Sequence, residues 1–196
     1  MSRYDPAQHS DSVRVPREVA GIPTGEDGFP QDLRLWVDEN ILVNLVLEAV
    51  QSVCEPGIDS RGKSEPLPEG RPRVFLTLLT YSYAVGIYAS DEIEDRIATE
   101  PALRYLSAGA RPSWHDLRRF RRQNREIIRG ALTRVLRIAR EFRLWSIAKM
   151  LDIDSAWCGR LAAVRTAEYK QTMLVIQAAN DRINQAVLRD SMALDE

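Results

Sequence analysis

Apolar residues recur at spacings of three, four or seven along most of the chain. This spacing keeps one side of a helix apolar and does not show the strict alternation of a half-buried strand. Ser90 is suited to be the N-cap of one predicted helix, and Gly109 is suited to end the next. The fold is therefore predicted to be all-α, with shorter helices over residues 31–53, 73–88, 91–99 and 101–108.

The segment 111–143 predicts the longest helix. Ser113 is followed three residues later by Asp116, which resembles a capping box with Asp in place of Glu. One face of this helix is apolar, and its members are Leu117, Phe120, Ile127, Ala131, Val135, Ile138 and Phe142. Arginines follow another face at the same spacing, at Arg118, Arg122, Arg125 and Arg129. The pattern predicts one continuous helix with a core side and a cationic side.

Two segments interrupt the helical pattern. Residues 1–31 contain four prolines and no sustained periodicity, which predicts a disordered arm. Residues 54–72 contain four prolines and three glycines, which exclude a helix or a central strand and predict a long loop. We therefore divide the chain into an arm over 1–31, a compact helical domain over 32–144 and a helical extension over 145–196.

The predicted helical extension carries a seam of nearly three heptads. Its members, spaced alternately by four and three residues, are Tyr169, Met173, Ile176, Asn180, Ile183 and Val187. A polar Asn inside such a seam can fix register and oligomeric state, so the seam predicts a homo-oligomer. The alternative is that the same stripe packs on the chain's own core.

Charge is concentrated around the long basic helix. Between Leu103 and Arg143 there are twelve arginines, no lysine and three acidic residues, a net charge of +9 in a chain of net charge −1. This asymmetry favours an oppositely charged partner, and nucleic acid is the first candidate. Arginine provides 24 of the 27 basic residues and suits bidentate contacts with phosphate and guanine, although genome composition could also explain the excess.

Side chains for catalysis or metal binding are sparse. The two histidines, His9 and His115, and the two cysteines, Cys54 and Cys158, cannot form a His-based triad or a metal site with sensible spacing. No glycine-rich phosphate loop is present, so we expect no cofactor. The clustered acids at the start of one helix have a structural role there; they are Asp91, Glu92, Glu94 and Asp95.

The sequence also predicts where the protein is located. No apolar leader follows the polar start, and the cysteines suggest no disulfide, so we expect a reduced, cytoplasmic protein, associated with the nucleoid if it binds DNA. The longest uncharged run, 74–90, is shorter than the roughly 20 apolar residues that cross a membrane. It is predicted to be a buried core helix and not a membrane span.

The region around His115 gives the clearest indication of function. A short helix, a turn over 109–112 and the basic helix have the layout of a helix-turn-helix, in which the start of the second helix faces base edges. The alternatives are a solvated arginine face and, for Trp114, a plug of the core instead of a groove contact. The predicted DNA contacts are Arg111, Trp114, His115, Arg118, Arg119, Arg121, Arg122, Arg125 and Arg129.

An ordered series of positions runs from the second predicted helix into the basic one. It consists of Tyr81, Ser82, Tyr83, Gly86, Ser90, Ile93, Glu94, Glu100, Tyr105, Leu106, Gly109, Arg111, Pro112, Arg119, Phe120, Arg121 and Arg122. In order and spacing the series resembles the amino-terminal helical domain of InsH-like insertion-sequence DDE transposases, and weakly so from Leu33 to Leu144. The resemblance implies binding of the double-stranded DNA at transposon ends.

The same resemblance implies a catalytic domain with a ribonuclease-H-like fold after about residue 144. The place of its first metal-binding acid falls at 150–154, where Asp152 or Asp154 could be a remnant. No glycine follows either residue, and the remaining 40 or so residues are too few to supply the other acids of a two-metal site. We therefore expect no enzymatic activity.

Two classes of function remain. The first is DNA binding by a transposase-derived protein that recognises or regulates transposon ends, or a non-functional remnant of one. The second is a helical oligomerisation or inhibitory module that forms mixed complexes with a full-length transposase through the 169–187 seam.

Overall fold

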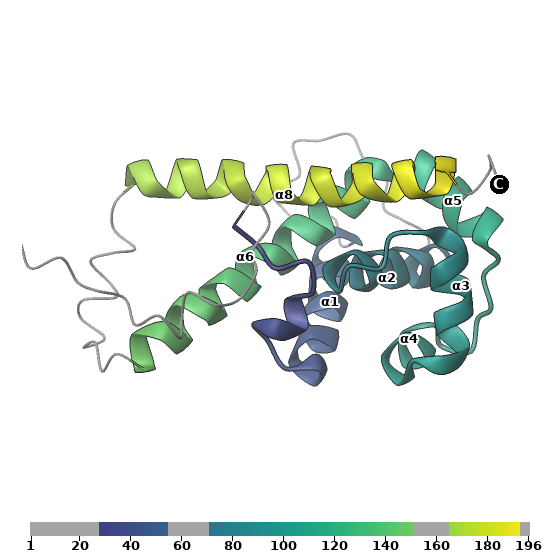
Figure 1. Cartoon of the computed structure of the whole chain (residues 1–196), viewed down its shortest axis with the longest axis horizontal. Helices are drawn as coiled ribbons and strands as arrows, with labels where there is room; N and C mark the ends of the chain where they lie inside the picture. The colour runs from purple at the N-terminus through teal and green to yellow at the C-terminus, as the bar shows by residue number, and fades with distance from the viewer. Residues whose placement is uncertain (1–27, 55–70, 151–164, 193–196) are drawn as a thin grey trace, which may run out of the picture.

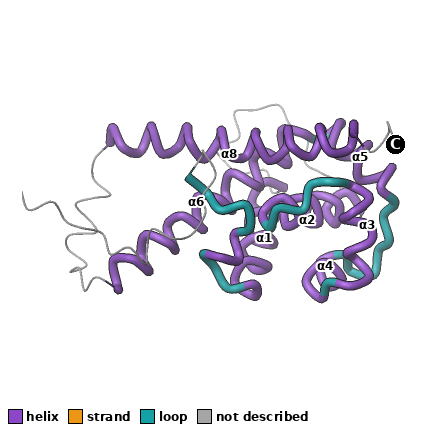
Figure 2. The backbone as a smooth tube through the Cα atoms, viewed as in Figure 1, coloured by secondary structure: helices purple, strands orange, loops and turns teal. Residues whose placement is uncertain are grey.

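The computed structural model describes residues 28–54, 71–150 and 165–192. Every regular element in these ranges is a helix, which confirms the all-α fold (Figure 2). The elements are η1 (Leu33–Leu35), α1 (Glu39–Cys54), α2 (Arg71–Ala84), α3 (Ser90–Thr99), α4 (Pro101–Leu106), α5 (Trp114–Gln123), α6 (Arg125–Met150) and α8 (Arg165–Met192). The predictions for the arm up to residue 27, for the loop over 55–70, and for Asp152, Asp154 and Cys158 lie outside the described residues.

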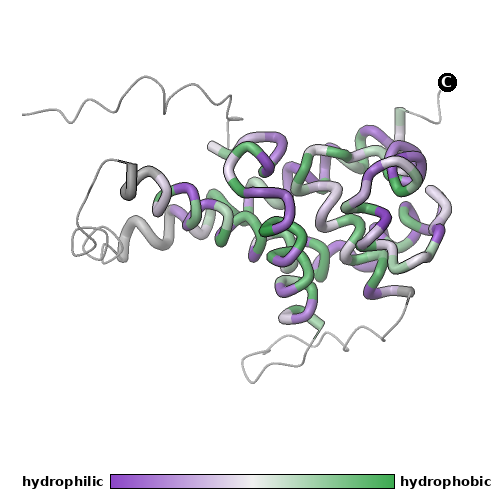
Figure 3. The backbone as a smooth tube through the Cα atoms, turned by 90° about the horizontal axis from the view of Figure 1, so that it is seen from below, coloured by the Kyte–Doolittle hydropathy of each residue, from purple (hydrophilic) through white to green (hydrophobic). Residues whose placement is uncertain are grey.

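Helix α2 forms the centre of the fold (Figure 1). Its side chains from Leu76 to Ala84 are all buried, because α1, α4, α5, α6 and α8 all contact it. Each of the other helices buries one side, and Figure 3 shows hydrophobic and hydrophilic residues alternating along the backbone. The uncharged run of the sequence is therefore a core helix, as predicted.

The end of α2 depends on Gly86. The helix ends at Ala84, four residues before the predicted end, and Gly86 has a φ of +82°. A Cβ atom at this position would lie 3.1 Å from the carbonyl oxygen of Gln31. Glycine thus permits both the left-handed conformation and the close approach of the segment before η1.

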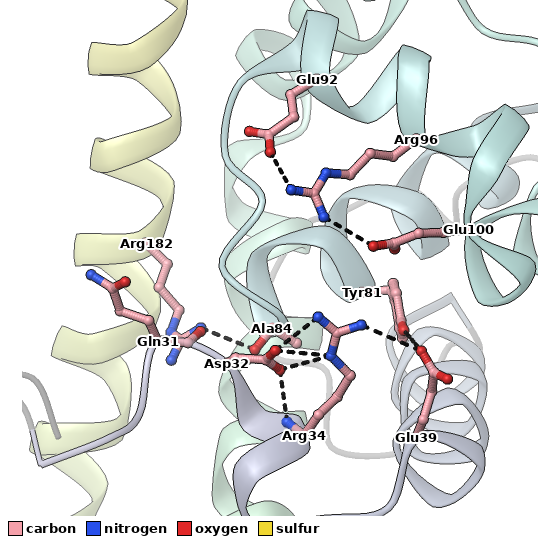
Figure 4. Close-up of polar contacts among 10 residues, drawn as sticks. All are labelled: Gln31, Asp32, Arg34, Glu39, Tyr81, Ala84, Glu92, Arg96, Glu100 and Arg182. Atoms are coloured by element: carbon pink, nitrogen blue, oxygen red, sulfur yellow. Dashed lines mark hydrogen bonds and ion pairs between the residues drawn. The ribbon is translucent and has the colours of Figure 1, made fainter. Parts of the chain in front are cut away.

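The segment before α1 is not part of that helix, contrary to the prediction of one helix from residue 31. Asp32 caps η1 by accepting the N–H of Arg34 at 2.9 Å, and its carboxylate also pairs with the Arg34 guanidinium. Glu39, the first residue of α1, accepts the hydroxyl of buried Tyr81 at 2.9 Å (Figure 4). Burial, together with this bond, raises the pKa of Tyr81.

Arg182 of α8 joins the C-terminal helix to the N-terminal segment. The residue is buried, and its guanidinium donates to the carbonyl oxygens of Gln31 at 2.9 Å and Ala84 at 3.2 Å (Figure 4). It also donates to those of Pro30 and Tyr83. Carbonyls at a helix C-terminus lack helical partners, and a cation there interacts well with the helix dipole.

The described part of the predicted extension shares the core with the rest of the protein. Helix α6 continues without interruption across residue 144, and α8 lies along α6 and contacts α2 (Figure 1). The buried apolar residues of α8 form a stripe of mostly small side chains, namely Val175, Ala178, Ala179, Ile183 and Ala186. Small residues allow the two long helices to pack closely.

Candidate nucleic-acid interface

The start of α5 is fixed by local and tertiary hydrogen bonds. The Ser113 hydroxyl accepts the Asp116 N–H at 3.2 Å, and the Asp116 carboxylate accepts the Ser113 N–H at 3.3 Å. This confirms the capping box predicted from the sequence. The next N–H, of Trp114, donates to Glu94 of α3 at 2.7 Å, so the first turn of α5 is held against α3.

The basic segment is two helices and not one. Asn124 separates α5 from α6, with φ −122° and ψ 29°. Its backbone N–H and its side-chain amide both donate to the carbonyl oxygen of Phe120, at 2.9 and 3.0 Å. Such side-chain bonds compete with the helical pattern, which explains the break. The predicted stripe from Arg118 to Arg129 therefore does not form one continuous face.

Arg121 faces the core and not the solvent. It is 3% exposed, and its guanidinium pairs with Asp190 of α8 and donates to the Tyr83 hydroxyl at 3.2 Å. Burial opposes its charge, but Tyr83 and Asp190 outweigh this effect and raise the pKa of Arg121, so the side chain stays protonated. The prediction that Arg121 contacts DNA is therefore wrong in this structure.

The buried carboxylate of Asp190 also accepts hydrogen bonds from α3. It accepts the backbone N–H of Ser90 at 2.8 Å and its hydroxyl at 2.9 Å. Ser90 consequently begins α3 and does not cap it, contrary to the prediction; the N-cap is Ala89. Arg118 also points toward this carboxylate, with Nε 3.9 Å from Oδ2 and a side chain that is 16% exposed. Burial raises the pKa of nearby Tyr83 to about 12.

Two further predicted DNA contacts have partners within the chain. Arg125 is exposed and donates to the side-chain oxygen of Asn184 in α8 at 2.6 Å. Arg129 is partly exposed and pairs with Glu126, three residues earlier on α6. Both remain at the surface, but each would have to leave its partner to bind a phosphate.

The outer face of α5 carries the arginines that the core does not use. Arg119 and Arg122 are exposed, and neither has a hydrogen bond or an ion pair within the part of the chain that the structure describes. With His115 and Gln123 they line an open hollow of about 480 Å³. Gln123 was not among the predicted contacts, although it lies four residues after Arg119 and so on the same helical face.

The edge of this hollow contains an aromatic pair. The indole of Trp114 stacks on the imidazole of His115, with ring centroids 3.4 Å apart and planes 26° apart. Trp114 is only partly buried, so it is not a plug of the core. Arg111, three residues before Trp114, is exposed and extends the cationic edge toward the turn.

The helix that supports α5 differs from the prediction. In a helix-turn-helix the first helix packs against the recognition helix, and α4 was predicted to take that place. In the structure α5 packs mainly on α3 and α2, while α4 packs on α3 and α2 and makes little contact with α5. The predicted pairing of α4 with α5 is therefore wrong, and α3 is the helix that supports α5.

The predicted oligomerisation seam does not form one surface. Ile183 is buried in the chain's own core, and Ile176 and Asn180 are partly buried. Met173 and Val187 are exposed by 49% and 40%, and the side chain of Tyr169 lies outside the described residues. The middle of the seam, from Ile176 to Ile183, therefore packs within the protein, as the alternative interpretation predicted, whereas Met173 and Val187 face the solvent.

Within the described ranges, no group of three or more His, Cys, Asp or Glu side chains is placed to hold a metal ion. Over the same ranges, none of the helices combines the length and apolar character required to cross a membrane.

Comparison of the chain with family models, curated proteins and solved structures finds no match. The resemblance to the transposase domain thus depends on the motif positions alone. The structure gives many of them a packing role: Tyr81, Tyr83, Ile93, Leu106 and Phe120 are core residues. Arg111, Arg119 and Arg122 are the arginines of the series that face the solvent.

Proposed function

We propose that this protein binds double-stranded DNA through the outer face of α5, as a transposase-type helical DNA-binding protein. The observation that carries the proposal is the pair Arg119 and Arg122, exposed beside His115 with no carboxylate partner in the described parts of the chain. Unpaired guanidinium groups can bind phosphate oxygens in a bidentate manner without first breaking an ion pair.

The inner face of α5 supports this assignment. Arg121 and, at longer range, Arg118 are held by Asp190, so they fix the orientation of the helix. The capping box and the contact from Glu94 fix its first turn. Side chains on the outer face are therefore presented by a rigid helix, which suits contacts that must match the spacing of phosphates. The resemblance to transposase domains implies transposon-end DNA as the target.

The competing interpretation is a solvated arginine face without a ligand, and salt dependence of DNA binding separates the two. Fluorescence anisotropy with a labelled blunt duplex of about 30 base pairs, titrated at about 50 to 200 mM salt, would give the slope of log affinity against log salt concentration. Arg119→Ala and Arg122→Ala are each expected to reduce this slope by up to about 0.9, because each removes a cation that neutralises backbone phosphate.

Arg137→Ala is the matched control. Arg137 is an exposed arginine on α6 that does not line the hollow and has no hydrogen bond or ion pair with the described residues. Its replacement removes the same charge and should leave the slope close to that of the unsubstituted protein. Absence of binding at low salt, or equal slopes for all three variants, would contradict the proposal. Circular dichroism of each variant checks that the helices are retained.

A second candidate function is self-association through the far ends of α6 and α8. The last buried apolar residue of α6 in the described chain is Ala139, and the first of α8 is Val175. Beyond these positions the exposed apolar residues Phe142, Met173 and Leu174 extend the apolar stripes past the core. Light scattering at high micromolar concentration tests this function. A homo-oligomer of the unsubstituted protein that becomes a monomer in Met173→Asp would support self-association. A monomer of the unsubstituted protein would exclude it. A mixed complex with a transposase would use the same surface.

A further inference from the structure

We infer that the hollow on α5 binds one unpaired nucleotide of a DNA strand, with the phosphate on Arg119 and Arg122 and the base on His115. This inference rests on the proposed DNA binding and adds the class of ligand that the same site takes. It explains two features together: the absence of carboxylates among the described residues that line the hollow, and the stacked rings at its edge.

The hollow is an open depression on the outer face of α5. Its volume is about 480 Å³, and it is lined by His115, Arg119, Arg122 and Gln123. These side chains supply a ring and an amide beside the two cations, which is more than a phosphate alone requires.

The charges that line the hollow suit a phosphodiester. Arg119 and Arg122 lie one turn apart on the same face, so both guanidinium groups can contact one phosphate. Among the residues that the structure describes, no carboxylate lines the hollow. The acid closest in sequence, Asp116, is used by the capping box, where it accepts hydrogen bonds from Ser113.

The stacked pair provides a surface for a base. The Trp114 indole lies against one face of the His115 ring at 3.4 Å, and His115 itself is exposed and lines the hollow. Aromatic side chains held in this way are the usual platforms for the bases of single strands. In a duplex both faces of each internal base are covered by its neighbours, so only an unpaired nucleotide, at an overhang or an opened end, can use this platform.

Gln123 can form hydrogen bonds with the edge of the base. Its side-chain amide has an NH2 donor and a carbonyl acceptor, and an unpaired adenine or thymine presents a donor beside an acceptor on its edge. Because Gln123 lines the hollow together with His115, the two side chains can contact the edge and the face of the same base. The site is therefore expected to gain affinity from either base.

The experiment compares three duplexes with the same paired sequence. One has blunt ends, one has a single-stranded overhang of three adenines, and one has three thymines. The full-length protein should bind the adenine overhang about tenfold more tightly than the blunt duplex, within the range of about 5- to 150-fold that stacking of one base gives. His115→Ala should bring the ratio of the two affinities toward one, and His115→Phe, which keeps an aromatic face, should retain the gain.

The possible results are distinguishable. Gln123→Ala should weaken binding of both overhang duplexes without removing the whole gain over blunt ends. Binding of blunt duplex with no gain from either overhang overturns the nucleotide site and leaves the proposed function in place. Failure to bind any of the three DNAs overturns both. If dAMP alone competes at the affinity of the overhang duplex, the ligand is a free nucleotide, and the assignment to a DNA strand is overturned.

Discussion

The side chain of Asp190 is predicted to make a large contribution to the free energy of unfolding of this protein. It is 5% exposed, it pairs with Arg121, and it accepts two hydrogen bonds from Ser90. Replacement by alanine leaves a guanidinium that is 3% exposed without its carboxylate, and it leaves the Ser90 N–H without its acceptor. The contact joins α3, α5 and α8, so its loss is expected to affect the whole fold.

The size of the effect follows from the burial of the pair. Removing one partner of a buried ion pair costs about 3 to 5 kcal/mol, because the other charge remains in a poorly solvated place. The whole free energy of unfolding of a typical domain is about 5 to 15 kcal/mol. Asp190→Ala is therefore expected to remain folded but to lose about 6 to 20 °C in Tm, at about 2 to 4 °C per kcal/mol for a chain of this size.

Urea unfolding followed by circular dichroism measures this loss. Adding Arg121→Met to Asp190→Ala removes the unpaired cation and should recover stability, with a coupling energy of about 1 to 3 kcal/mol. Asp181→Ala is the matched control on the same helix, since Asp181 has no hydrogen bond or ion pair with the described residues, and it should change stability by no more than about 0.5 kcal/mol. A loss below about 1 kcal/mol for Asp190→Ala, with an unchanged m-value, would refute the burial of this pair.

Four other substitutions test separate parts of the fold. Gly86→Ala should lower the free energy of unfolding by more than the roughly 1 to 2 kcal/mol that a left-handed alanine costs, because its Cβ would also meet Gln31. Gly109→Ala is the control for the backbone strain alone, since Gly109 has a φ of +79° and a Cβ there would meet nothing within 4 Å. Equal losses of unfolding free energy for the two variants in urea would argue against the close approach of Gln31 to Gly86. Gly130 lies inside α6, and a Cβ atom there would be 3.6 Å from Cγ1 of Val53 in α1, an ordinary contact. Gly130→Ala should therefore raise the free energy of unfolding by about 0.5 to 1 kcal/mol. A lower Tm would mean that α1 and α6 lie closer together than described. Because the pKa of buried Tyr83 rises from an ordinary value near 10 to about 12, its stabilising effect is present below pH 10 and is lost as the pH rises toward 12. Tyr83→Phe should therefore flatten the decline of unfolding free energy in that interval by up to about 1.4 kcal/mol per pH unit, and an unchanged slope would show that Tyr83 is solvated.

The predictions that held depend on interactions between neighbours in the sequence. The apolar spacing identified α2 and the region of α6, and the Ser113–Asp116 spacing identified the cap of α5. Helical periodicity and capping involve residues within about four positions of each other, so both can be recognised in one sequence. The same reasoning failed at Asn124, where the helix breaks although the apolar spacing continues.

The candidate site shows the limit of local reasoning most clearly. The same residue type occurs at Arg118, Arg119, Arg121 and Arg122, so all four were predicted to contact DNA. Gln123 was missed because an uncharged side chain adds nothing to a charge count, although its spacing from Arg119 placed it on the same face. For Arg182 and Asp190, which turn out to be buried, no local signal exists in the sequence.

The sequence by itself determined that this protein is helical, that its arginines are concentrated in one segment, and where the first turn of α5 begins. Only the tertiary structure decided which of these arginines face the solvent. Asp190 lies 69 positions from Arg121, and it draws that side chain into the core because a buried guanidinium needs a carboxylate partner. Arg119 and Arg122 remain outside because α5 turns them away from α8, toward the hollow that they share with His115.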